Sequence, residues 1–267
     1  MANVSGGDPM VDERVNRPTV EELIIKAESM KLDKDGVRAA FEHSSAPKFV
    51  AQTSSWLPDS EAVHNLMLDA VEPYLTNGGR VLDLGSGTGR LTRLVLDRFP
   101  ECSVVAADYS ETMRAVAAKE LSEYGERLSM VDLDMFDAPW HSADLEFSDF
   151  DAVVSGFAIH HGRSFDEDKS LYQRICESLR PNGLFINLDH VAGESRRQTI
   201  SNAANWRDFL DQAGNIESDR FIVGSYAEDT PISIPEHTKA LNESGFERVE
   251  VPWQQMFFAL YQAVKAS

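Results

Sequence analysis

The stretch Val81-Leu82-Asp83-Leu84-Gly85-Ser86-Gly87-Thr88-Gly89-Arg90 begins as an apolar run and continues directly into a glycine-rich segment. It predicts a buried strand, a tight turn and the start of a helix. Glycine lets such a turn bring its backbone close to a ligand, and the first turn of a helix presents free N–H groups. The dinucleotide fingerprint G-x-G-x-x-G needs a third glycine where this chain has Arg90, so the spacing disfavours a nicotinamide cofactor.

The residues around this turn alternate between short apolar runs and helical patterns, as is typical of a parallel sheet covered by helices on both faces. We expect strands at residues 80–84, 103–107, 128–132, 151–155, 184–189, 246–251 and 256–264. We expect helices at residues 89–99, 110–124, 166–179 and 235–244. The stop signal Arg180-Pro181-Asn182-Gly183 should close the third of these helices. The last two strands, joined by a short connection, should pair antiparallel.

The chain before the sheet is expected to carry two appendages. Residues 1–17 are polar, and we interpret them as a mobile N-terminal arm. Residues 18–58 are interpreted as a helical cap. In this cap Thr19 and Glu22 make a capping box that predicts a first helix, and a second helix is expected at residues 34–42.

A polar segment at residues 193–230 does not fit the alternating pattern. It lacks strand periodicity and contains one helical pattern, near residues 202–213. We interpret it as an insertion over the sheet edge that serves as a lid. Residues 18–267 are then expected to form one α/β domain.

Composition narrows the class of protein. The 267 residues, 42% of them hydrophobic, can bury one sizeable core. Forty-four acidic residues against 25 basic ones give a formal charge of -19, which disfavours a nucleic-acid partner. Cys102 and Cys176 support neither a disulfide framework nor a cysteine metal site, which fits a reducing compartment. No signal-peptide core and no run of about 18 apolar residues occurs, so we expect a cytoplasmic protein without a membrane partner.

An acidic residue, Asp108, stands at the tip of the second expected strand, where a carboxylate can accept hydrogen bonds from ribose hydroxyls. With the glycine-rich turn it indicates a nucleoside-containing ligand. Here the chain resembles class I S-adenosylmethionine-dependent methyltransferases, whose first motif is similar to residues 83–89 and whose second motif ends in such an acid. The match runs over about residues 60–267. The resemblance implies S-adenosyl-L-methionine as cofactor and a doubly wound, Rossmann-like, seven-stranded, mostly parallel sheet whose last strand is antiparallel.

The resemblance also implies roles for the residues that match these motifs. Gly85 and Gly87 would line the methionine portion of the cofactor, and Asp83 would help to hold its ammonium group. Asp134 would accept the adenine amino group, and Met135 would supply a backbone donor. The residues expected to bind the cofactor are Asp83, Gly85, Ser86, Gly87, Asp108, Tyr109, Met113, Asp134, Met135 and Ser155.

Several of these residues also have a structural interpretation. Asp83 alone could be a turn residue, Asp134 a solvated loop acid, and Met113 a packing residue. Asp132 competes with Asp134, because a shift of two residues along a strand keeps the same face.

The methyl transfer is expected where the fourth strand ends, at residues 154–161. In the resembling family this stretch contacts both the methionine portion and the acceptor. His160 is the candidate catalytic base, since imidazole has a reference pKa of about 6.5. Alternatively, His160 and His161 bind loop backbone and shape the pocket. The Asn/Asp-Pro-Pro-aromatic sequence of adenine and glutamine methylases is absent, which disfavours nucleic-acid and protein-amide substrates.

A metal is not expected at this position. The fourth and fifth strands should be neighbours, which would bring together His160, His161, Asp189 and His190. No H-x-x-x-H or carboxylate spacing orders these residues, however, and we predict no metal site.

The acceptor pocket is expected to use aromatic and basic side chains from outside the cofactor half. Aromatic residues could form an apolar cap, and arginines could pair with an anionic acceptor. Ordinary packing or a solvated charge is the alternative for each. The residues expected to bind the acceptor are Trp56, Phe157, His160, Arg196, Arg197, Trp206 and Tyr226.

The function expected from these features is methyl transfer to a small molecule by in-line displacement, with the cap and the insertion excluding water. Two alternatives stay open. The chain could modify the cofactor itself, as a carboxy-S-adenosylmethionine synthase does, with Arg196 or Arg197 holding the carboxylate. It could instead be a non-catalytic S-adenosylmethionine-binding protein. The sequence indicates neither the acceptor atom nor the oligomeric state.

Overall fold

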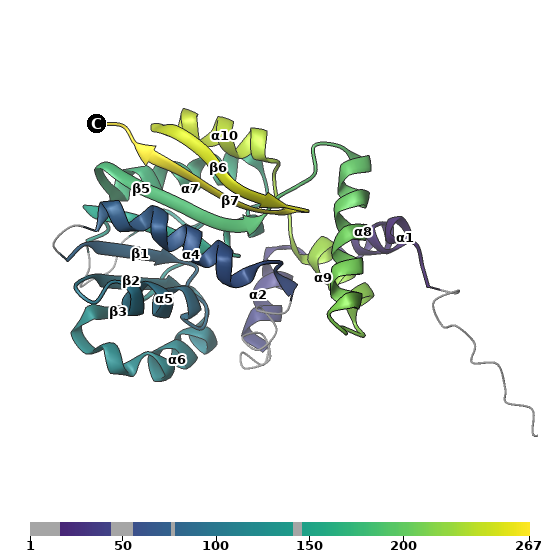
Figure 1. Ribbon diagram of the computed structural model, residues 1–267, viewed down its shortest axis with the longest axis horizontal. Helices are drawn as coiled ribbons and strands as arrows, with labels where there is room; N and C mark the ends of the chain where they lie inside the picture. Colours follow the sequence, from purple (N-terminus) through teal and green to yellow (C-terminus); the bar gives the residue numbers. More distant parts are fainter. Residues whose placement is uncertain (1–16, 44–55, 76–77, 141–145) are drawn as a thin grey trace, which may run out of the picture.

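The computed structural model describes residues 17–43, 56–75, 78–140 and 146–267. The expected mobile arm, apart from Arg17, and residues 44–55 of the expected cap lie outside the described residues. One sheet with helices on both faces forms the body of the protein (Figure 1). Its strands are β1 (Arg80–Leu84), β2 (Ser103–Asp108), β3 (Leu128–Asp132), β4 (Phe150–Gly156), β5 (Leu179–His190), β6 (Phe246–Gln255) and β7 (Phe258–Lys265).

The sheet has seven strands in the order β3-β2-β1-β4-β5-β7-β6. Strands β1 to β5 pair in parallel, and β7 runs antiparallel to both β5 and β6. The doubly wound sheet and the antiparallel C-terminal pair, both expected from the sequence, are thereby confirmed. β1 and β3 have the predicted bounds, because each is a short apolar run with a clear break at either end.

Helices connect the strands and cover the sheet. They are α1 (Val20–Ser29), α2 (Lys34–His43), α4 (Ser60–Val71), α5 (Arg90–Arg98), α6 (Glu111–Glu120), α7 (Phe165–Ser178), α8 (Arg196–Gln212), α9 (Ser218–Glu228) and α10 (Ile234–Glu243). Short 3₁₀ turns occur at Glu72–Tyr74, Ser122–Arg127 and, as η4, at Ile159–His161. The predicted capping box of α1 is confirmed, since Thr19 and Glu22 bond reciprocally.

Two hydrophobic clusters lie on opposite faces of the sheet. One contains Val63 and Met67 of α4 with Val95 of α5, and the other contains Tyr172 of α7 with Leu241 of α10. The buried strands thus supply side chains to both faces, which explains their near-continuous apolar sequences. None of the described helices is both long and apolar enough to cross a bilayer.

Strand β5 begins earlier than the sequence predicted. Leu179 pairs with Phe150, but the next pair joins Leu184 to Ala152, so the residues between them bulge out of the ladder. This bulge holds the expected helix stop signal, whose Pro181 has no N–H to donate and whose Asn182 has a φ of 59°. Helix α7 ends before it, at Ser178.

The polar segment after β5 forms two helices where one was expected. Helix α8 starts at Arg196 because the Ser195 side chain accepts a hydrogen bond from the N–H of Gln198. Helix α9 was missed, since Gly224 in its middle disfavours a helix and its apolar residues stand mostly in one run, residues 221–223, without clear helical spacing. Burial of Ile222 against the core stabilises it instead.

Helices α1, α8 and α9 pack together beyond the carboxyl end of β5 (Figure 1). They do not lie over an edge of the sheet, as the sequence had suggested; the edges are β3 and β6. Arg17 joins this group, because its guanidinium pairs with Asp219 and Asp211 at 2.6 Å each. Trp206 of α8 fixes the group to the body, since its indole N–H donates to the carbonyl of Trp56 at 2.8 Å.

Candidate functional site

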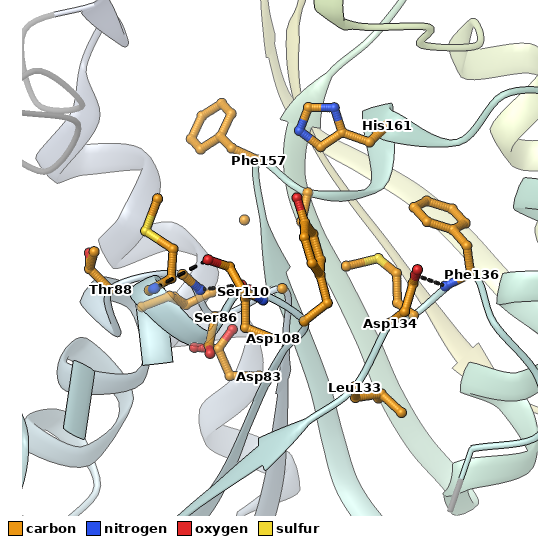
Figure 2. A pocket seen from close by; sticks show the side chains of 18 of the residues that line it. Asp83, Ser86, Thr88, Asp108, Ser110, Leu133, Asp134, Phe136, Phe157 and His161 are labelled. Carbon is orange, nitrogen blue, oxygen red and sulfur yellow. Dashed lines mark hydrogen bonds between the residues drawn. The ribbon is translucent and has the colours of Figure 1, made fainter. Parts of the chain in front are cut away.

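A cleft opens where β1, β2 and β4 end (Figure 2). β1 lies between β2 and β4, so the strand order reverses here, and open α/β sheets bind ligands at this point. Helices α2 and α4 and the loop after β3 complete its walls. The lining includes the following residues that were expected to bind the cofactor: Asp83, Gly85, Ser86, Gly87, Asp108, Tyr109, Met113, Asp134 and Met135.

Asp83 presents a buried carboxylate oxygen to this cleft. The Thr92 hydroxyl donates to its Oδ2 at 2.5 Å, whereas Oδ1 has no hydrogen-bond partner among the described residues. Burial, and to a smaller extent the charge of Asp108, raises the pKa of Asp83 to about 7. An orphaned carboxylate oxygen of this kind suits a ligand with a positive charge.

The glycine-rich turn is shaped by its neighbours. Gly85 has a φ of 74°, and a Cβ there would lie 2.4 Å from the Cβ of Ala158 and 2.8 Å from the Cε of Met135. Gly87 has a φ of 54°, but a Cβ there would meet no atom within 4 Å. Gly85 therefore lets two loops of the protein approach each other, whereas the space beside Gly87 belongs to the cleft.

The carboxylate of Asp108 ties the glycine-rich turn to the helix that follows β2. Its Oδ2 accepts a hydrogen bond from the N–H of Gly87 at 2.8 Å, and its Oδ1 accepts one from the N–H of Ser110 at 2.8 Å (Figure 2). A carboxylate oxygen can accept more than one hydrogen bond, so these two bonds do not exclude a ligand hydroxyl as a further donor.

The loop after β3 separates the two competing aspartates. The Oδ1 of Asp134 accepts the N–H of Phe136 at 2.9 Å, and its Oδ2 lies 3.4 Å from the Nζ of Lys34. The side chain of Asp132 is 72% exposed, pairs with Arg114 and does not line the cleft. The geometry therefore favours Asp134.

Ser155 and Phe157 end β4 in different environments. Ser155 is fully buried, does not line the cleft, and donates its hydroxyl to the carbonyl of Leu84 at 2.7 Å. Phe157 lines the cleft with a φ of 55°, a strained value for an aromatic residue. The rings of Phe157 and Trp56 pack edge to face, with their centroids 4.6 Å apart. Trp56 thus supports the wall of the cleft without being part of the lining.

Of the two adjacent histidines, His161 lines the cleft and His160 does not. Figure 2 shows His161 beside Phe157, opposite Asp83 and Asp108. Burial and the neighbouring His160 lower the pKa of His161 to about 3, so its ring is neutral at pH 7. The sequence singled out His160 because spacing alone does not say which ring of a pair points inward.

His160 lies between two buried carboxylates. Its Nδ1 bonds to Asp189 at 2.5 Å, and its Nε2 lies 3.3 Å from Asp229. Burial opposes a charged ring, but the two carboxylates outweigh it and hold the pKa of His160 well above 6.5. His190 also bonds to Asp229, at 2.9 Å, so the histidines of β4 and β5 do converge.

The other residues expected to bind the acceptor lie outside the described lining. Arg196 pairs with Glu28, and Arg197 is exposed. Trp206 is buried against Phe257. Tyr226 packs its ring against the same phenylalanine.

Basic and acidic side chains that the sequence analysis did not select lie in the lining instead. They come from α2, α4, α5, the loop into α7 and the first turn of α7, segments whose approach to the cleft depends on tertiary packing. They are Lys34, His64, Arg90, Arg163 and Glu167. Arg163 could have been found, because it closely follows the histidine pair at the end of β4.

Comparisons with known proteins agree with this geometry. A family model described as a methyltransferase domain matches residues 81–183. A carboxy-S-adenosyl-L-methionine synthase of Nautilia profundicola is 22% identical over 203 residues, which cover 75% of this chain and 83% of the relative. A trans-aconitate 2-methyltransferase of an Acidovorax species is 32% identical over 152 residues, which cover 55% of this chain and 53% of the relative.

Solved structures share the fold. A possible exported protein from Bordetella parapertussis has a TM-score of 0.62 at 14% identity, covering 96% of this chain and 100% of that one. The CurJ carbon methyltransferase has a TM-score of 0.56 at 18% identity, covering 77% of this chain and 54% of that one. The matches to CurJ and to the trans-aconitate relative thus span only about half of those proteins. The methyltransferase-domain match and the relatives, together with the shared fold, support a class I S-adenosylmethionine-dependent methyltransferase.

The cofactor of these methyltransferases is S-adenosyl-L-methionine, and the cleft fits it. The orphaned oxygen of Asp83 is placed for an ammonium group, and the space beside Gly87 is open for a ligand. Asp108 lies next to Gly87, at the distance of one hydrogen bond. An orphaned carboxylate oxygen, an open space and a second carboxylate therefore occur together.

The close approach at Gly85 gives the first prediction. Gly85→Ala should lower the free energy of unfolding by about 2–4 kcal/mol, from the positive φ and the contact with Ala158. Gly156→Ala is the matched control, because its Cβ would lie 3.6 Å from Leu91, an ordinary contact. It should change stability by less than about 1 kcal/mol. Urea denaturation without ligand measures both, and equal losses would contradict the argument.

Proposed function

We propose that this methyltransferase moves the methyl group of S-adenosyl-L-methionine to a small-molecule acceptor held beside Phe157 and His161. The observation that carries the proposal is the buried Asp83 oxygen, which lacks a protein partner in the described chain and lines the cleft next to the glycine-rich turn. A positively charged amino acid group would satisfy it.

The cofactor would lie along the glycine-rich turn. Asp83 would take its ammonium group, and Gly85, Ser86 and Gly87 would face its methionine portion. Asp108 would accept hydrogen bonds from the ribose hydroxyls while keeping its two backbone bonds.

The adenine would lie between apolar side chains of β2, α6 and the loop after β3. Met113 and Leu133 are buried and line this part of the cleft, together with Tyr109. Asp134 would accept the adenine amino group. Met135 would act through its backbone N–H, because its carbonyl already accepts the indole N–H of Trp140.

The acceptor would approach from the side of Phe157 and His161. Methyl transfer is an in-line displacement, so the protein mainly aligns the nucleophile and keeps water out. His161 is the ring that can touch an acceptor, and His160 would position it through the adjacent backbone. Helices α8 and α9 would form the lid, and α1 of the N-terminal cap would close with them. The Lys31 ammonium, just after α1, donates to the carbonyl of Asp229, just after α9.

An anionic acceptor fits the charges at this end of the cleft. Arg163 donates one N–H to the carbonyl of Leu32 at 2.9 Å, while its buried Nε–H has no partner among the described residues. A carboxylate could accept from it. One relative is named for methylation of trans-aconitate, an anion of this class.

A second candidate function is carboxylation of the cofactor. Relatives named carboxy-S-adenosyl-L-methionine synthase match over 70–84% of this chain. Arg196 and Arg197, the residues first considered for the carboxylate, do not line the cleft, so Arg163 would have to replace them. Mass spectrometry of ligand extracted from the purified protein separates the two functions, because a carboxylated cofactor is heavier than S-adenosyl-L-methionine.

Calorimetric titration tests the cofactor site. The protein should bind S-adenosyl-L-methionine and S-adenosylhomocysteine at micromolar concentrations and should not bind NAD. Asp108→Asn should weaken binding at least tenfold, because it removes the charge that faces the ribose. Asp132→Asn is the control, since Asp132 lies at the end of the neighbouring strand but outside the cleft. Absence of binding by folded, ligand-free protein would rule out the proposal.

The raised pKa of Asp83 predicts pH-dependent binding. The pKa of about 7 lies above the ordinary value of 3.8, so below pH 7 the carboxyl is mostly protonated and neutral. It then attracts an ammonium group less. Affinity for S-adenosylhomocysteine should fall about tenfold from pH 7.5 to pH 5.5. The Asp83→Asn variant should bind S-adenosylhomocysteine more weakly at pH 7.5, and its affinity should no longer depend on pH in this range. If the variant keeps the pH profile of the unchanged protein, another group causes the pH dependence.

Arg163 provides a test of the acceptor class. Methyl transfer to a panel of small mono-, di- and tricarboxylates, including trans-aconitate, would be followed through S-adenosylhomocysteine release. Arg163→Gln should raise the KM for the carboxylate at least tenfold and leave the affinity for S-adenosylhomocysteine unchanged. Arg196→Gln is the control outside the cleft. If the protein methylates a neutral compound and Arg163→Gln leaves that activity unchanged, the proposal of an anionic acceptor is wrong.

A further inference from the structure

A cluster of three imidazoles and two carboxylates lies behind the His161 wall of the cleft. His160 and His161 come from η4, Asp189 and His190 from the end of β5, and Asp229 from the residue after α9. All but His161 are buried. Elements far apart in the sequence thus bring ligand-type atoms to one point.

Three of these atoms are spaced for a metal ion. The Oδ1 of Asp229 lies 3.3 Å from the Nε2 of His160 and 3.8 Å from the Nδ1 of His161. The three residues offer one ligand atom each, and these atoms lie within 4.8 Å of one another. An ion at about 2.0–2.2 Å from each would need small side-chain shifts.

We propose that His160, His161 and Asp229 bind a divalent transition-metal ion of the Mn²⁺ to Zn²⁺ series. Two imidazoles and one carboxylate form a ligand set that such ions use, and the set leaves coordination positions open. The proposal goes beyond methyl transfer, because metal binding can be measured without any acceptor.

The surrounding groups orient the proposed ligands. The Oδ1 of Asp189 bonds to the Nδ1 of His160, which directs the Nε2 of that ring toward Asp229. His190 in turn bonds to the Oδ2 of Asp229 and leaves Oδ1 toward the two other ligands. A carboxylate behind a ligating imidazole is the usual arrangement at metal centres.

The charges of the cluster agree with a divalent ion. Two carboxylates buried at one point are costly without positive charge beside them. The imidazolium of His160 lies between the two, and an ion of charge +2 bound at the deprotonated Nε2 would take over its role. Because His161 also lines the cleft, an open coordination position would face the acceptor and could take one of its oxygens.

Metal titration of chelator-treated, tag-free protein tests the site. Zn²⁺ should bind in calorimetry with one equivalent per chain and a micromolar or lower dissociation constant. Co²⁺ should give visible absorption bands that Zn²⁺ abolishes. His161→Ala and Asp229→Asn should each weaken Zn²⁺ binding at least a hundredfold, and Asp189→Asn about tenfold, because it only orients a ligand.

Asp132→Asn is the matched control for Asp229→Asn, since this exposed carboxylate pairs with Arg114 outside the cleft and should leave Zn²⁺ binding unchanged. The far-ultraviolet circular dichroism spectrum of each variant shows that it is folded, and titration without cofactor or acceptor keeps this test separate from that of the cofactor. No stoichiometric binding of Zn²⁺ or Co²⁺ by folded protein would overturn the proposal. So would binding that both His161→Ala and Asp229→Asn leave intact.

Discussion

The buried carboxylate of Asp189 holds together the part of the molecule on which the site depends. Its Oδ2 accepts hydrogen bonds from the backbone N–H groups of Ile159 and His160 and from the side chain of Asn187. Its Oδ1 accepts the N–H of His190. These bonds fix the turn after β4 against the end of β5. The charge and the side-chain hydrogen bond of His160, with the bonds from Asn187 and His190, keep the pKa of this buried acid low although burial alone would raise it.

The opposite side of the cleft depends on a second acid used in the same way. Asp108 joins the glycine-rich turn to the start of α6 through two backbone hydrogen bonds. The cleft therefore lies between two loops that are each fixed by a carboxylate. Asp83, at its floor, differs from both because one of its oxygens is left for a ligand. Hydrogen bonding thus distinguishes the carboxylates that stabilise the loops, Asp108 and Asp189, from Asp83, which has one oxygen without a hydrogen-bond partner among the described residues.

Local patterns predicted the sheet, the glycine-rich turn and the cofactor side of the cleft, because in a parallel sheet the strand ends bring motif residues together. They did not predict which ring of the His160–His161 pair turns inward, or that Arg196 would pair with Glu28. Those outcomes depend on how α8 and α9 pack, and α9 itself is stabilised by burial of residues such as Ile222 more than by helix propensity. Asp229 was overlooked for the same reason.

The contact between Arg17 and Asp219 joins positions 202 residues apart in the chain. During synthesis from the ribosome, α1 emerges long before α9, the helix it packs against. The sheet strands β1 to β5 all lie between the two and can pair first. The group of α1, α8 and α9 can therefore form only after α9 has emerged, and α10, β6 and β7 follow it in the chain. Until α9 emerges, the apolar face of α1, with Leu23, Ile24 and Ala27, lacks the helix it packs against most.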